Sequence, residues 1–173
     1  AQAGLSPKQM PIASLTTSEA EVREMGKDLA VGHITAAPYF QSIKSEANAR
    51  FVKLYQKKYG AEEPVTFGAE AAYFQMHIFA EALEQSGSSE TAAVREKLLN
   101  AEFDAPQGRV RIDADNNHTY LWPRIGRVNR QGMFDIVSES ISIVKPDPYL
   151  VSPNAHEWGM KKFKMRGSAG GQH

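Results

Sequence analysis

Three consecutive hydroxyl side chains, Thr16, Thr17 and Ser18, follow a short apolar segment near the start of the chain. Hydroxyls both donate and accept hydrogen bonds, so they can bind a small uncharged polar ligand. Hydroxyls placed just before Glu19 and Glu21 are also typical of a helix N-cap. The residue types alone favour the cap, and both interpretations stay open at this point.

Three other side chains are candidates for lining a small pocket: Tyr39, Glu70 and Tyr73. Tyr39 ends an apolar segment and offers a ring and one hydroxyl, which suits either a pocket wall or a position in the core. Glu70 and Tyr73 begin a long predicted helix. A first-turn acid that favours the helix dipole is the simpler explanation of Glu70.

The sequence lacks the patterns of an enzyme or a metal site. The five histidines show no H-x-x-x-H or H-E-x-x-H spacing, and cysteine is absent. The segment that begins at Asp113 lacks the glycine and glutamate of a calcium loop. No G-x-S-x-G or S-x-x-K motif supplies a nucleophile. We therefore predict no catalytic residue, no metal and no cofactor.

The charge balance argues against nucleic acid as a direct partner. Twenty basic residues match twenty acidic ones, so no long-range field of one sign attracts phosphates. The basic cluster of residues 161–166 lies near the end of the chain, where a solubilising tail is the simpler interpretation. Apolar residues make up 42% of the chain, which is typical of a folded globular protein.

These candidates need elements that position them, and the first half of the chain predicts a βαβ unit. Residues 12–15 read as a short buried strand, residues 19–31 as a helix with Val22, Met25 and Leu29 on its apolar face, and residues 33–40 as a second strand. We expect the two strands to be adjacent and parallel because right-handed crossovers dominate such units.

Further elements follow along the chain. Residues 45–59, 68–85 and 90–100 are predicted helices, and the second carries apolar residues on one side: Ala72, Met76, Phe79, Ala80 and Leu83, together with Gln75. Residues 108–113 read as a strand, residues 115–118 as a turn, and residues 123–129 with 133–139 as a hairpin. The fold class is α/β, which we expect as an incomplete parallel three-layer αβα architecture with a C-terminal β-hairpin region.

Six segments in order resemble the periplasmic-binding-protein type I class, the family of branched-chain amino acid, amide and urea receptors. They are residues 11–19 (PIASLTTSE), 37–43 (APYFQSI), 69–73 (AEAAY), 105–108 (APQG), 115–118 (DNNH) and 146–149 (PDPY). The similarity is closest to amide-sensing members. Proteins of this family close a small ligand between two α/β lobes joined by crossing strands.

The resemblance implies a C-terminal portion of such a receptor. Residues 1–47 would belong to the second lobe, 48–130 to the first lobe and 131–155 to the second lobe again, with a loosely ordered tail at 156–173. The first-lobe helices, without the strands they normally cover, would expose an apolar face, so copies of the chain are expected to self-associate.

The resemblance also implies a function. We expect a periplasmic solute-binding component of an ABC importer, with a short-chain amide or urea as ligand, a membrane permease as partner, and Thr16, Thr17, Ser18, Tyr39, Glu70 and Tyr73 near the ligand. The alternatives are a cytoplasmic sensor that sequesters a regulatory protein and, with less support, an amide hydrolase.

Overall fold

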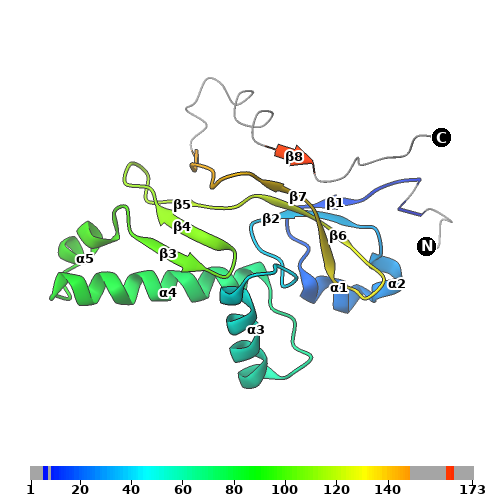
Figure 1. Ribbon diagram of the computed structural model, residues 1–173, viewed down its shortest axis with the longest axis horizontal. Helices are drawn as coiled ribbons and strands as arrows, with labels where there is room; N and C mark the ends of the chain where they lie inside the picture. Colours follow the sequence, from blue (N-terminus) through cyan, green and yellow to red (C-terminus); the bar gives the residue numbers. More distant parts are fainter. Residues whose placement is uncertain (1–5, 8, 149–162, 166–173) are drawn as a thin grey trace.

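The computed structural model describes residues 6–7, 9–148 and 163–165. These residues form a mixed α/β structure in which two sheets are flanked by helices (Figure 1). The predicted α/β class is confirmed. No helix among the described residues is long and apolar enough to cross a membrane.

The larger sheet has five strands in the order β1-β2-β6-β7-β8. β1 (Ala13–Ser14) and β2 (Ile34–Ala37) are parallel neighbours, which confirms the predicted βαβ unit. β6 (Arg124–Val128) and β7 (Phe134–Ser140) form the predicted hairpin. β2–β6, β6–β7 and the pairing of β7 with β8 (Phe163–Met165) are antiparallel, so in the described residues parallel pairing is confined to β1–β2.

The connection between β1 and β2 differs from the single predicted helix. It consists of α1 (Glu19–Met25) and α2 (Lys27–Ala30), separated by Gly26 at a φ of +83°. Because the chain turns there, Val22 is buried while Met25 and Leu29 are exposed. The predicted apolar face is therefore wrong at these two positions.

β1 also differs from the predicted buried strand. It is an edge strand of the sheet, and Ile12 and Leu15 at its ends are 50% and 77% exposed. An apolar run of four residues cannot by itself distinguish an edge strand from a central one.

The smaller sheet packs on the longest helix. β3 (Glu102–Ala105), β4 (Gly108–Ile112) and β5 (Thr119–Tyr120) are antiparallel, and α4 (Phe67–Ser86) runs along them (Figure 1). Phe74 and Ile78 of α4 form a core with Ala105 and Val110. α5 (Thr91–Leu98) follows α4 and buries Val94.

The helix caps follow the sequence closely. α3 (Glu46–Tyr59) begins after Ser45, whose side chain accepts a hydrogen bond from the Asn48 N–H, and it ends at Gly60, as predicted. α4 begins after Thr66, which caps it in the same way, and it ends at Gly87 in the left-handed conformation.

The buried side of α4 is not the side that carries the predicted apolar stripe. The stripe is exposed: Ala72, Gln75, Met76, Phe79, Ala80 and Leu83. The buried positions are Glu70, Phe74, Ile78 and Ala82. α4 is therefore apolar on two sides, one of which packs on the smaller sheet while the other lies open.

The predicted segment boundaries are only partly visible in the structure. A boundary at residue 130 falls between β6 and β7 and divides one hairpin of the larger sheet. The assignment of segments to lobes stays a prediction. Of the predicted tail at 156–173, only residues 163–165 lie inside the described part of the chain.

Gly126 on β6 allows two aromatic rings to meet in the core of the larger sheet. A methyl group there would lie 2.7 Å from Phe40 Cζ and 3.0 Å from Phe134 Cδ1. Both rings are buried and cannot move aside freely. We expect Gly126→Ala to lower the free energy of unfolding by about 1 to 3 kcal/mol, the usual cost of overpacking, in urea denaturation.

Gly68→Ala is the matched control for this prediction. Gly68 lies in the first turn of α4, and a methyl group there makes only an ordinary contact of 3.7 Å with Thr66. We expect this variant to be as stable as the parent chain or more stable, because alanine favours the helix. Equal losses in the two variants would show that the rings tolerate the methyl group.

Candidate functional site

The loop after β1 presents two threonines at the edge of the larger sheet. The Ser14 Oγ accepts hydrogen bonds from the N–H groups of Thr16 at 3.0 Å and Thr17 at 3.1 Å. Thr16 is exposed and Thr17 is half-buried. In open α/β sheets, ligands bind beyond the carboxyl ends of parallel strands, which is where this loop lies.

Ser18 is engaged in the helix cap. Its side chain accepts a hydrogen bond from the Ala20 N–H, and the Glu21 carboxylate accepts one from the Ser18 N–H at 2.7 Å, forming a capping box. The hydrogen bonds from the Ser18 side chain and N–H hold the pKa of Glu21 below its ordinary value. Of the three hydroxyls, those of Thr16 and Thr17 are the ones placed toward solvent.

Tyr39 is fully buried directly after β2. Its hydroxyl donates a 2.8 Å hydrogen bond to the Asn48 Oδ1, and the Asn48 Nδ2 donates to the carbonyls of Gln41 and Ile43. Burial raises the pKa of the Tyr39 hydroxyl well above its ordinary value. The structure therefore places Tyr39 inside the segment that leaves the larger sheet, where it holds that segment in place.

Glu70 and Tyr73 are also interior residues. The Glu70 carboxylate accepts hydrogen bonds from the Gln107 side-chain amide at 2.9 Å and the Gln107 N–H at 3.3 Å. Burial raises the pKa of Glu70 to about 7. The Tyr73 ring packs on Phe51 and His77, with centroids 4.6 and 4.5 Å apart.

Arg124 joins the two sheets, and sequence reasoning missed it. Its guanidinium donates to the carbonyls of Pro38 at 2.6 Å, Gln107 at 2.8 Å and Trp122 at 3.3 Å. Its Nε lies 3.4 Å from the Glu139 carboxylate. One side chain thus connects the end of β2, the β3–β4 turn and the segment before β6.

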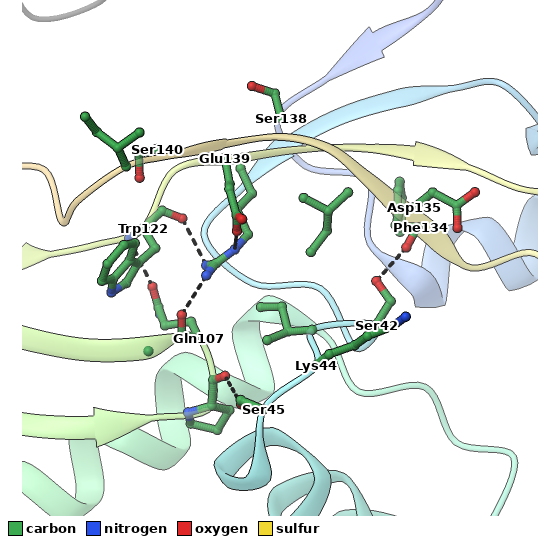
Figure 2. A pocket seen from close by; sticks show the side chains of 16 residues that line it. Ser42, Lys44, Ser45, Gln107, Trp122, Phe134, Asp135, Ser138, Glu139 and Ser140 are labelled. Carbon is green, nitrogen blue, oxygen red and sulfur yellow. Dashed lines mark hydrogen bonds and ion pairs between the residues drawn. The ribbon is translucent and has the colours of Figure 1, made fainter. Parts of the chain in front are cut away.

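A concavity of about 950 Å³ opens beside this arginine, between β7, the segment after β2 and the β3–β4 turn. Figure 2 shows Glu139, Gln107 and Trp122 converging at one end of it, with Ser42 and Lys44 at the other. None of the six candidate residues lines it. Within the described residues, no group of acidic or histidine side chains could hold a metal ion.

Comparison with known proteins gives a family match over most of the chain. Residues 1–155 match the family described as periplasmic binding protein domain. A curated relative, named limonene hydroxylase, from Geobacillus stearothermophilus is 30% identical over 128 residues, which are 74% of this chain and 23% of that protein.

Solved structures of similar fold are solute-binding proteins. One from R. palustris, in complex with 4-hydroxybenzoate, is 25% identical with a TM-score of 0.70 and covers 87% of this chain and 42% of its own. An amino acid transporter substrate-binding protein from Pseudomonas fluorescens is 21% identical with a TM-score of 0.68, covering 81% and 39%. A leucine-binding protein from Thermotoga maritima is 19% identical with a TM-score of 0.63, covering 84% and 39%.

Proposed function

The chain belongs to the periplasmic binding protein domain family, and we propose that it forms part of a periplasmic receptor that delivers a small solute to the permease of an ABC importer. The chain spans about two fifths of the length of the solved relatives described above. A receptor containing this chain would therefore include further elements of the same fold. The curated relative named as a hydroxylase shares 23% of its length, so its activity is not transferred to this chain.

The loop after β1 is the observation that carries the solute site in this proposal. The Ser14 hydroxyl orients the main chain so that Thr16 and Thr17 lie beyond the end of a parallel strand. Their hydroxyls are uncharged and can both donate and accept, which suits a ligand with one carbonyl and several N–H groups. We therefore propose a short-chain amide or urea as the solute.

The ligands of related structures define the competing solutes. Printed descriptions of those proteins name amino acids and benzoates, which carry a carboxylate. Calorimetric titration of acetamide, urea, leucine and 4-hydroxybenzoate into the complete receptor would separate the classes. Binding of the two carboxylates alone would reject the amide proposal, and ammonia release from acetamide or urea would point to a hydrolase instead.

Replacing Thr16 or Thr17 by valine should weaken amide binding by about 1 to 3 kcal/mol, the cost of leaving a buried polar group of the ligand without its partner. The change keeps the side-chain shape and removes the hydroxyl. Calorimetry on the complete receptor measures the effect. Thr91→Val, at the first position of the distant helix α5, is the control and should leave affinity unchanged.

A further inference from the structure

The segment of residues 38–45 connects the larger sheet to α3, and two buried carboxylates act on it from different elements. Glu19 is the first residue of α1, and Glu70 lies in the first turn of α4. Their side chains are only 2% and 0% exposed. Within the described residues neither carboxylate forms an ion pair, which is unusual for buried acids.

Glu19 holds the segment directly. Its Oε1 accepts a 2.8 Å hydrogen bond from the Gln41 N–H. Its Oε2 is buried and has no hydrogen-bond partner in the described part of the chain. The titratable groups that act on it are Glu21 of the same helix, which is also acidic, and Tyr39, so no cation compensates a charge on Glu19.

Glu70 holds the segment through Gln107 and Arg124. The carboxylate accepts from Gln107, the Gln107 carbonyl accepts from Arg124, and Arg124 donates to the Pro38 carbonyl. Arg124 exerts a favourable charge effect on Glu70, but its N–H groups are directed to carbonyls and its Nε to Glu139. Tyr39, between the two acids, contributes no charge near neutral pH.

We propose that Glu19 and Glu70 form a proton-operated latch on the segment of residues 38–45: protonated, they stabilise the closed connection between the two sheets, and ionised, they favour its local opening. A neutral carboxyl is tolerated in the interior, whereas a buried negative charge without a cation is costly until water reaches it. Opening the segment admits that water.

The raised pKa values support this geometry. Burial is the main cause in both cases and raises the pKa of Glu19 and of Glu70 to about 7. The switch therefore operates near neutral pH. If the receptor function proposed above holds, on which this step alone rests, the latch makes solute affinity depend on pH because it acts on the connection between the sheets.

The latch can be tested on the chain alone, without any solute. The carboxyl-carbon NMR signals of Glu19 and Glu70 should titrate with midpoints near 7. Hydrogen exchange of the Gln41 and Gln107 amides, corrected for its intrinsic pH dependence, should accelerate on the order of tenfold to a hundredfold from pH 5 to pH 8. Midpoints below about 5 for both acids would overturn the proposal.

Variants assign the effect to each acid. Glu19→Gln should abolish the excess acceleration at Gln41, and Glu70→Gln should abolish it at Gln107, because glutamine mimics the neutral carboxyl. Glu62→Gln, at an exposed position, should leave both accelerations intact. Acceleration that persists unchanged in both glutamine variants would overturn the latch. A failure to bind any amide, by contrast, would reject the proposed solute and leave these results standing.

Discussion

Replacing Arg124 by methionine should lower the free energy of unfolding by about 3 to 5 kcal/mol, the range found when one partner of a buried ionic network is removed. Methionine fills much of the same space but donates no hydrogen bond. The carbonyls of Pro38 and Gln107 would lose their guanidinium donor inside the protein. Urea denaturation of the parent and the variant measures the difference.

Arg127→Met is the matched control, since Arg127 lies three residues further along β6 with an exposed side chain. Surface substitutions of this kind usually change stability by less than about 0.5 kcal/mol. If both variants lose the same stability, the effect comes from the strand and not from the bonds of Arg124. Arg124→Lys should behave more like methionine than like arginine, because one ammonium cannot reach the same set of carbonyls.

The sequence predicted best what local chemistry determines. Ser45 and Gly60 delimit α3 because a hydroxyl cap and a glycine stop act within one turn of the helix. The β6–β7 hairpin was predictable because its turn residues lie between two β-rich segments. Gly26 was the exception, since a single glycine inside an apolar pattern does not show whether a helix continues or turns.

The buried side of α4 could not be predicted from periodicity. Phe74, Ile78 and Ala82 form one apolar row, and Met76, Phe79 and Leu83 form another. A helix that is apolar on two sides gives no internal signal for choosing between them. The choice depends on which side meets β3 and β4, and that contact joins residues far apart in the sequence.

The interior polar network was missed for a related reason. Arg124 and Pro38 are 86 residues apart, and Gln107 and Glu70 are 37 apart. No spacing rule links such pairs. Tyr39 and Glu70 were correctly selected as unusual residues, and the structure places them in the interior that joins the sheets. Thr16 and Thr17 stay the predicted ligand contacts, because the exposed loop after β1 matches the simple rule about strand ends.

The stability of the whole chain should decrease as pH rises from about 4.5 to about 7, which is the reverse of the usual acid denaturation. Glu19 and Glu70 have an ordinary pKa of 4.5 in the unfolded chain and a pKa of about 7 in the fold. Below pH 4.5 both states are protonated, so the stabilisation is fully present. Between these values the unfolded state has released its protons and the folded state has not, so unfolding becomes progressively more favourable.

The expected loss is about 3 kcal/mol for each carboxyl, because one pKa unit corresponds to about 1.4 kcal/mol. Asp104 and Glu21 have lowered pKa values, so their opposite contribution falls below pH 4.5 and outside this window. Urea midpoints at pH 5 and pH 8 measure the effect. The double variant Glu19→Gln, Glu70→Gln should have nearly equal midpoints at both values, whereas a parent chain more stable at pH 8 than at pH 5 would show that the two acids are ionised in the fold and that other interactions stabilise their charges.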